Sequence, residues 1–252
     1  MTTSHVLTVT CPTTRGIVAA ISTYLAETGC NITDSSQYDD TMTGRFFMRV
    51  SFDSQTGTGI EALRAGFAPV AERLDMDWAI HGCGERMKVL LMVSNFGHCL
   101  NDLLYRWRIG ALPIDIVGVI SNHLTYQKVV VNHDIPFHHI KVTKENKPEA
   151  EARLMAVVHE TGAELIVLAR YMQILSDQMC REMSGRIINI HHSFLPSFKG
   201  ANPYKQAYER GVKLIGATAH YVTADLDEGP IIEQDTVRVT HAQSPEDYVS
   251  LG

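Results

Sequence analysis

The pattern of apolar residues changes at a short glycine-containing segment, and this change most constrains the fold. Before Gly82, apolar residues alternate as in antiparallel strands, with two amphipathic helical stretches between them. Residues 88–93 instead form a near-continuous apolar run, which is typical of a strand buried on both faces. Because two glycines lie between two complete patterns, we place a linker at residues 82–86 and predict two domains, residues 1–83 and 84–252.

The first domain is predicted to fold in the order strand, helix, strand, strand, helix, strand. Its strands are expected at residues 5–10, 31–38, 45–52 and 75–81, and its helices at residues 16–27 and 60–74. This order is the split βαβ pattern (βαββαβ) of a ferredoxin-like domain.

The second domain is predicted to alternate strands with helices. Its strands are expected at residues 88–93, 115–121, 164–169, 187–190 and 217–223, and its helices at residues 100–107 and 147–160. Such alternation indicates an α/β fold with a doubly wound, mostly parallel sheet. In such sheets the ligand-binding loops follow the carboxyl ends of the strands.

Composition narrows the classes of function. The chain has 252 residues, of which 45% are hydrophobic and 20% charged, and its net charge is −6. This acidic balance argues against nucleic acid as the main partner. There is no apolar run of roughly 20 residues that could span a membrane, and the first residues lack the pattern of a signal peptide. Five scattered cysteines favour reduced thiols in a cytoplasmic protein.

Two short segments carry residues suited to chemistry at a carbonyl carbon. Residues 189–196 read Asn-Ile-His-His-Ser-Phe-Leu-Pro, and residues 225–230 read Asp-Leu-Asp-Glu-Gly-Pro. Each begins where a predicted strand gives way to a loop. An Asn amide can bind a developing oxyanion, a His can move a proton, and an Asp can orient both the His and a water molecule.

Together with the strand at residues 213–220, these segments resemble the folate-dependent formyltransferase family. That family carries an Asn-x-His-Pro/His-Ser-x-Leu-Pro segment and a later Leu-Asp-x-Gly-Pro loop. The resemblance implies that Asn189, His191 and Asp227 are the catalytic residues. Taken singly, each has a structural interpretation, as a turn cap, a buried histidine or a loop-shaping residue. Whether His191 or Asp227 takes the first proton is left open.

Residues 11–18 and 29–32 resemble an ACT domain. The resemblance implies that Pro12, Arg15, Gly16 and Asn31 lie near an amino-acid effector or a partner subunit. The alternative is that Pro12 and Gly16 only shape a turn while the sheet serves oligomerisation. An ACT-like sheet that pairs edge to edge would give a homodimer or a homotetramer.

A loop after the first strand of the second domain helps to distinguish between the activities found in this family. In the transformylase that acts on glycinamide ribonucleotide, a Gly-Ser-Asn element there holds the substrate phosphate. The corresponding residues here are Gly97-His98-Cys99. A bulkier loop favours water as the acceptor, although Gly97 and His98 remain candidate substrate-binding residues. An ACT-like domain joined to such a catalytic domain is similar to the arrangement of formyltetrahydrofolate deformylases.

This resemblance implies hydrolysis of 10-formyltetrahydrofolate to tetrahydrofolate and formate, which would supply one-carbon and purine metabolism. Residues 169–175 resemble the family's pterin-binding loop, so Met172, Gln173 and Leu175 are expected to bind the folate. The alternative is a strand-to-helix connection with Met172 and Leu175 in the core. No prosthetic group is expected, and no metal, because adjacent histidines at 138 and 139 would point to opposite faces of a strand.

Two other functions remain open. One is transfer of the formyl group to an amine acceptor, and the other is a folate- or amino-acid-responsive sensor without turnover. A helix beginning near Ser244 has room for only about two turns, so we expect the C-terminal end to be shorter than in related deformylases. Such a short end would be compatible with an impaired catalytic domain.

Overall fold

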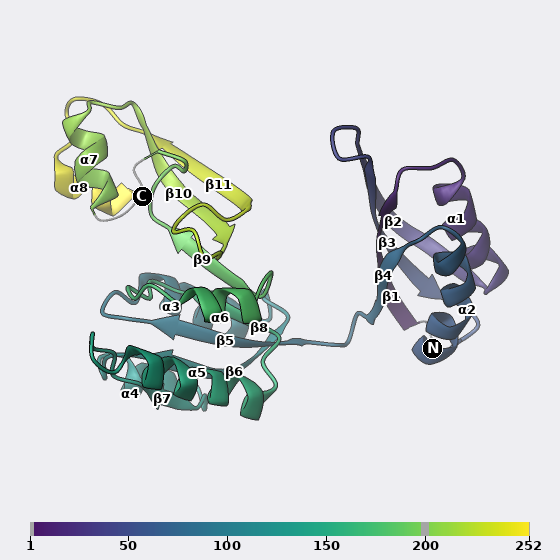
Figure 1. The fold of residues 1–252 in the computed structure, drawn as a ribbon, viewed down its shortest axis with the longest axis horizontal. Coiled ribbons are helices and arrows are strands. Elements are labelled where there is room, and N and C mark those ends of the chain that lie inside the picture. Colours follow the sequence, from purple (N-terminus) through teal and green to yellow (C-terminus); the bar gives the residue numbers. More distant parts are fainter. Residues whose placement is uncertain (1–2, 198–201, 252) are drawn as a thin grey trace. The chain divides into compact units, whose positions relative to one another are not determined.

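The structure is a computed structural model that describes residues 3–197 and 202–251. The chain divides into two compact units, Met1–Arg86 and Met87–Gly252, both drawn in Figure 1. The boundary falls three residues after the one expected from the glycines. Residues 83–85 stay with the first unit, because Cys83 N donates to Ser4 O and Glu85 N donates to Gly82 O, each at 2.9 Å.

The first unit has the predicted βαββαβ order. Its elements are β1 (Thr3–Pro12), α1 (Ile17–Glu27), β2 (Cys30–Asp40), β3 (Arg45–Ser54), α2 (Ile60–Arg73) and β4 (Asp77–Gly82). The strands form one antiparallel sheet in the order β2-β3-β1-β4.

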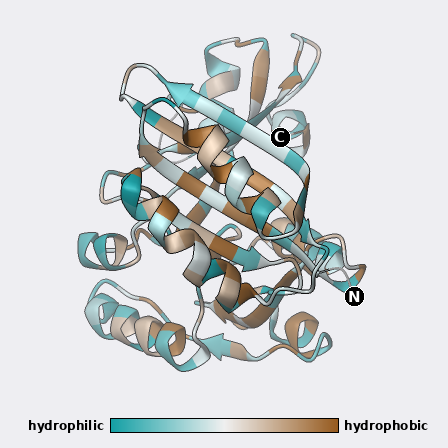
Figure 2. Ribbon diagram, turned by 90° about the vertical axis from the view of Figure 1, so that its right-hand side faces the viewer, coloured by the Kyte–Doolittle hydropathy of each residue, from teal (hydrophilic) through white to brown (hydrophobic). Residues whose placement is uncertain are grey.

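Buried and exposed residues alternate along the strands of this sheet, and this alternation decides which face the helices cover. Every second residue of β3 from Phe46 to Phe52 is buried, together with alternate residues of β1 such as Leu7 and Val9. The buried stripes of α1 and α2 pack on this face and form one apolar core. In Figure 2 the helices show brown bands beside teal ones, as expected of amphipathic helices.

The second unit is built on a seven-stranded sheet in the order β11-β10-β9-β8-β5-β6-β7. Its strands are β5 (Met87–Val93), β6 (Ile114–Ser121), β7 (Phe137–His139), β8 (Leu165–Leu168), β9 (Ile187–His191), β10 (Leu214–Tyr221) and β11 (Ile231–Arg238). Its helices are α3 (His98–Arg108), α4 (Gln127–Val131), α5 (Lys147–Thr161), α6 (Asp177–Glu182), α7 (Pro203–Glu209) and α8 (Pro245–Leu251).

The sheet is mostly parallel, as predicted, but its β9-β10-β11 end is antiparallel. Strand β11 was not predicted, because its central residues are polar and most of its side chains are exposed. It forms by pairing with β10, which is a long-range interaction that no local pattern indicates. Strand β10 spans Leu214–Tyr221, which agrees with the strand expected at residues 213–220 within one residue at each end.

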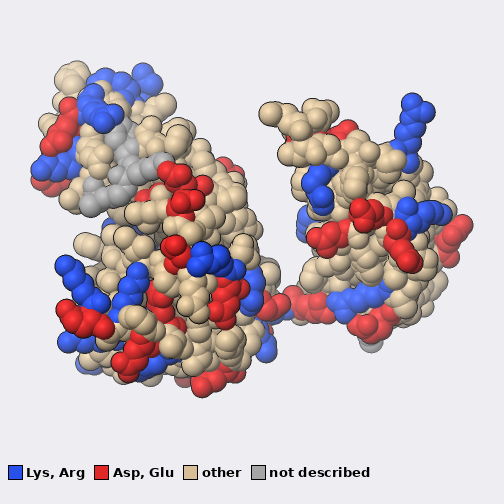
Figure 3. All heavy atoms as spheres, in the orientation of Figure 1, with Lys and Arg blue, Asp and Glu red and all other residues tan. Residues whose placement is uncertain are grey.

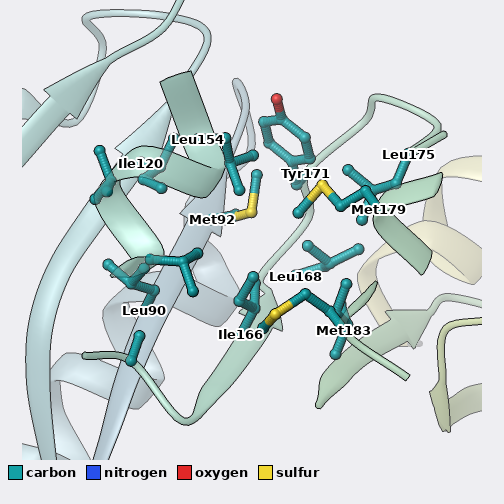
Figure 4. Close-up of a cluster of buried hydrophobic side chains, with 14 of the residues drawn as sticks. Leu90, Met92, Ile120, Leu154, Ile166, Leu168, Tyr171, Leu175, Met179 and Met183 are labelled. Atoms are coloured by element: carbon teal, nitrogen blue, oxygen red, sulfur yellow. The ribbon is translucent and has the colours of Figure 1, made fainter. Parts of the chain in front are cut away.

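Helices cover both faces of the parallel part of the sheet. Leu90 and Met92 of β5 point towards α5 and α6, and they form the cluster of which part is shown in Figure 4. Val89 and Leu91 point the other way, towards α3 and α4. This two-sided burial explains why residues 89–93 are all apolar.

The surface shows no concentration of one sign of charge on the face drawn in Figure 3, where acidic and basic side chains are interspersed. In the part of the chain that the structure describes, no helix combines the length and the apolar character needed to cross a bilayer.

Candidate active site

The pairing of β9 with β10 assembles the polar side chains that the sequence singled out. Asn189 and His191 are two residues apart on β9, so they project from the same face of the sheet. In the antiparallel register Asn189 lies opposite His220, and His191 lies opposite Thr218. These four positions therefore form one polar patch on the β9-β10 ladder.

A cavity of about 280 Å³ opens over this patch. Asn189, His191 and His220 line it from the sheet, and Asp227 lines it from the loop that follows β10. The loop that follows β8, residues 170–175, forms another wall. The structure thus brings the three residues expected to be catalytic into one cavity, together with the loop expected to bind the pterin.

His191 and Asp227 form a buried pair. His191 Nδ1 lies 3.4 Å from Asp227 Oδ1, and their side chains are only 6% and 8% exposed. An acidic partner at Nδ1 orients the imidazole and favours the tautomer in which Nδ1 carries a hydrogen. The pairing therefore assigns proton exchange with a substrate to the other ring nitrogen, Nε2.

The loop that carries Asp227 is held close to the end of β10. Asp227 has a left-handed backbone conformation, with φ 57°, which Asp adopts more readily than most residues. Tyr221 N donates to Pro230 O at 2.9 Å. A Cβ at Gly229 would lie 1.7 Å from Tyr221 O, so this close approach of the two backbones requires glycine.

His220 positions the amide of Asn189. Its Nδ1 lies 3.0 Å from Tyr221 O, and because a carbonyl can only accept, Nδ1 carries a hydrogen. Nε2 of the neutral ring then accepts from Asn189 Nδ2 at 3.2 Å. Burial lowers the pKa of His220, which is consistent with this neutral form. The contact fixes which end of the amide is the donor.

His192 lies beside this group. Its ring centroid is 5.6 Å from that of His191 and 5.9 Å from that of Tyr204. Burial, with the neighbouring charge of Arg170, lowers the pKa of His192 to about 4. His192 is therefore neutral at pH 7 and contributes ring surface rather than charge.

The expected folate-binding residues all line the cavity, but in different ways. Leu175 is buried and belongs to the core cluster, so the structural alternative holds for this residue as well as the pocket role. Met172 N already donates to Ser94 Oγ at 3.0 Å, but the residue is 53% exposed, so its side chain remains accessible to a ligand. Ile174 and Leu226 are also large, apolar and exposed at this cavity, and they were not predicted.

Gly97 and His98 do not line the cavity. Gly97 precedes α3, and the ring of Tyr126 packs on it so closely that a Cβ would lie 2.3 Å from the ring. The Tyr126 hydroxyl donates to Asn95 O at 3.1 Å. His98 begins α3, where burial and the charge of Arg170 lower its pKa.

The four residues expected at an effector site are exposed, but the structure does not bring all of them together within one chain. Pro12 lies opposite Arg45 at one end of β3, whereas Asn31 lies opposite Asp53 at the other end. Eight residues of strand correspond to roughly 26 Å. Arg15 and Gly16 precede α1, near Pro12 in the sequence, and Gly16 has φ 88°.

Buried polar contacts that sequence reasoning missed support the loop after β9. Thr218 Oγ1 donates to Ser193 O at 2.7 Å and accepts from Leu195 N at 3.2 Å. Gln234 of β11 donates to Leu195 O at 3.0 Å. The motif contains Ser193 and Leu195 but does not indicate Thr218 or Gln234 as their partners, because these contacts depend on the pairing of β9, β10 and β11. Among the described residues no group of three or more His, Cys, Asp or Glu side chains could hold a metal.

Comparisons with known proteins agree with this architecture. A family model described as formyl transferase matches residues 87–250, and one described as ACT domain matches residues 5–65. A formyltetrahydrofolate deformylase from Corynebacterium sp. (strain P-1) is 53% identical over 249 residues, which are 98% of this chain and 87% of that protein. One from Bacillus subtilis (strain 168) is 49% identical, over 98% of this chain and 83% of that protein.

A solved structure extends the agreement to three dimensions. The formyltetrahydrofolate deformylase from Burkholderia mallei ATCC 23344 matches with a TM-score of 0.94 and 50% identity, covering 99% of this chain and 89% of that one. These matches span both units and confirm the resemblance seen in the sequence. The chain belongs to the formyltetrahydrofolate deformylase family.

Proposed function

We propose that this protein hydrolyses 10-formyltetrahydrofolate to tetrahydrofolate and formate, with Asn189, His191 and Asp227 as its catalytic residues. The observation that carries the proposal is the buried His191–Asp227 pair, which shares a cavity with the oriented amide of Asn189. Relatives that match nearly the whole chain at 49–53% identity are named for this activity. The proposal therefore rests on the site and on the family together.

The amide of Asn189 is suited to stabilise the oxyanion. Attack of water on the formyl carbon places negative charge on the formyl oxygen. Asn189 Nδ2 has two hydrogens, and the one not held by His220 can be donated to that oxygen. One such donor typically increases the catalytic rate by a factor of about 10²–10³.

His191 and Asp227 are suited to transfer the protons during hydrolysis. The water must lose a proton as it attacks, and the folate nitrogen must gain one before the C–N bond breaks. His191, held by Asp227, can carry a proton between these atoms through Nε2. Acid-base catalysis by a positioned side chain typically increases the catalytic rate by a factor of about 10²–10⁴.

Apolar side chains at the cavity favour a flat ring system. Met172, Ile174 and Leu226 are each more than half exposed, which leaves apolar surface that a bound pterin would cover. Leu175 and Gln173 add an apolar and an amide contact. We place the pterin between residues 170–175 and the loop that carries Asp227.

Water is favoured over a phosphorylated amine as the acceptor. A phosphate commonly binds to backbone N–H groups at a helix N-terminus. At α3 the ring of Tyr126 covers Gly97, and Asn95 lies 3.2 Å from His123 through their side-chain nitrogens. These contacts occupy the approach that the phosphate of glycinamide ribonucleotide would need.

Formate release tests the proposal. The purified chain is given 10-formyltetrahydrofolate alone, and then with glycinamide ribonucleotide. We expect equal formate release in both reactions and no formylated ribonucleotide. Turnover that requires the amine would replace hydrolysis by formyl transfer. Folate binding without turnover would instead indicate a sensor.

We further propose that the first unit mediates self-association in a cytoplasmic homo-oligomer and that Pro12, Arg15 and Gly16 border an amino-acid effector. Strand β2 lies at the edge of its sheet and is exposed along nearly all of its length, which leaves a free edge for a second copy. Light scattering coupled to gel filtration tests the assembly, and a monomer at micromolar concentration would contradict it.

A further inference from the structure

Arg170 occupies an unusual position at the end of β8. Its φ is 66°, a left-handed conformation that disfavours a long side chain. The surroundings nevertheless hold it there, because Ser94 N donates to Arg170 O at 3.1 Å. Its guanidinium carbon lies 5.3 Å from the ring centroid of Phe96, which is a cation–π distance. An unfavourable backbone conformation kept in this way often marks a functional position.

The guanidinium has no anionic partner among the described residues. Its Nε is buried and has no hydrogen-bond partner within residues 3–197 and 202–251. Burial lowers the pKa of Arg170, and the groups that oppose this effect are Cys99 and Tyr204. The ordinary pKa values of a thiol and a phenol leave both largely neutral at pH 7. A half-buried cation without a counter-charge is costly unless a ligand supplies one.

This cation borders the cavity that holds the catalytic residues. Arg170 lines the same cavity as Asn189 and His191. His192 lines this cavity too, and the charge of Arg170 contributes to lowering the pKa of both His98 and His192. This part of the site is therefore electropositive and can donate hydrogen bonds, as an anion requires.

We propose that Arg170 binds the carboxylate of the product, so that formate is released from a subsite formed by Arg170 and His192. The proposal rests on the proposed function, because hydrolysis produces an anion whereas transfer to an amine produces a neutral formamide. Water adds its oxygen to the formyl carbon, the folate nitrogen receives one of the two protons of that water, and the C–N bond breaks. The second proton of the water leaves from the carboxyl group of formic acid at neutral pH, and the resulting formate pairs with the guanidinium.

A second source of carboxylate exists, namely the glutamate of the folate itself. Both anions would pair with a guanidinium in the same way. The buried Nε and the neighbouring imidazole of His192 favour a small anion, so we assign formate. The experiment below separates the two by measuring formate binding in the absence of any folate.

Binding of ¹³C-formate to the unliganded protein is measured by NMR titration at constant chloride, and formate inhibition is measured during turnover. Arg170→Met is expected to weaken formate binding at least ~10-fold, as loss of a charge-assisted pair implies, and Arg170→Lys less. Arg170→Gly removes the same group while relieving the backbone strain, so it covers the case in which Arg170→Met folds poorly. Arg106→Met is the matched control, because Arg106 is exposed and pairs with Asp102 at 2.7 Å.

Unchanged formate affinity in both Arg170→Met and Arg170→Gly would overturn the proposal. A rise in KM for the glutamylated substrate, without a change in formate affinity, would assign Arg170 to the folate tail instead. The binding titration needs no turnover. Its result can therefore contradict the formate subsite without contradicting the proposed hydrolysis, and the reverse also holds. Formate binding that depends on Arg170 in a protein without hydrolase activity would retain the anion subsite and reject the proposed function.

Discussion

The two units bury very different kinds of side chain. The core of the first unit is apolar, and its buried polar residues in the described part are His5 and Ser54. The second unit buries many more polar residues around its sheet. These are Ser94, Ser121, Asn122, His191, Ser193, Thr218 and His220.

This difference shows that the chain buries polar side chains where other groups can form hydrogen bonds with them. A buried polar group is unfavourable unless it is hydrogen-bonded. In the second unit such partners are supplied, for example by Ser94 Oγ, which donates to Asn122 Oδ1 at 2.7 Å. The polar interior of the second unit supports a reactive site, whereas the first unit obtains its stability from ordinary apolar packing.

The largest expected effect comes from Asp227→Asn. Asn tolerates the left-handed backbone at this position, so the fold should be retained while the charge that holds His191 is lost. We expect turnover to fall by about 10²–10⁴-fold with little change in folate affinity, measured by formate release and by equilibrium binding. Asp225→Asn, in the exposed part of the same loop, serves as the control. Unchanged turnover would remove Asp227 from the mechanism.

The next effect should appear in the first unit alone. Phe67 is fully buried and packs edge-on against Tyr24 and Trp78, so Phe67→Ala should destabilise this unit by about 3–5 kcal/mol. The two tryptophans of the sequence lie one in each unit, at positions 78 and 107. With Trp107→Phe as background, urea unfolding followed by Trp78 fluorescence reports the first unit. A shift of less than about 1 kcal/mol would show that this core tolerates the cavity.

Gly97→Ala tests the contact that closes the N-terminus of α3. The new methyl group would collide with the Tyr126 ring, and overpacking of this kind costs about 1–3 kcal/mol. Adding Tyr126→Ala should recover part of that stability, which a double-mutant cycle of urea unfolding would measure. Gly84→Ala, where a Cβ meets nothing within 4 Å, is the control. Strict additivity of the two changes would show that the ring is not the obstacle.

The smallest effect concerns pH. The pKa of His192 is lowered to about 4 in the folded protein, against about 6.5 when unfolded. The unfolded chain therefore binds more protons between these values, so His192 makes stability fall as the pH drops from about 6.5 to about 4. Melting experiments at pH 7 and pH 4.5 should show a smaller loss for His192→Gln than for the unaltered protein. His241→Gln, at an exposed histidine, should leave the loss unchanged.

Sequence patterns predicted those elements whose signals are local. The helix expected at residues 147–160 is α5, which begins at Lys147 and ends at Thr161 before the left-handed Gly162. The strand expected at residues 45–52 likewise forms as β3, in which alternate residues from Phe46 to Phe52 are buried. Strand β11 had no such signal, since its polar residues become a strand only when β10 supplies hydrogen-bond partners.

In the candidate site, too, local sequence signals predicted some residues, whereas others depend on long-range contacts. Asn189, His191 and Asp227 could be selected because their residue types and spacing suit carbonyl chemistry and match a family motif. Gly97 and His98 were expected to contact substrate from their place in the chain, yet the Tyr126 ring covers Gly97 and neither residue lines the cavity. Arg170 received no role, because its sequence neighbours do not show that its half-buried guanidinium has no counter-charge among the described residues.

The sequence by itself determined the two-domain order and the fold class of each unit, and it selected Asn189, His191 and Asp227 as candidate catalytic residues, because hydrophobic periodicity and motif spacing are properties of the chain. Only the tertiary structure decided that β9 and β10 pair so that His220 orients Asn189, and that the Gly229 turn brings Asp227 to His191. The reason is physical: pairing register, burial and electrostatic environment arise from contacts between residues that are distant in sequence.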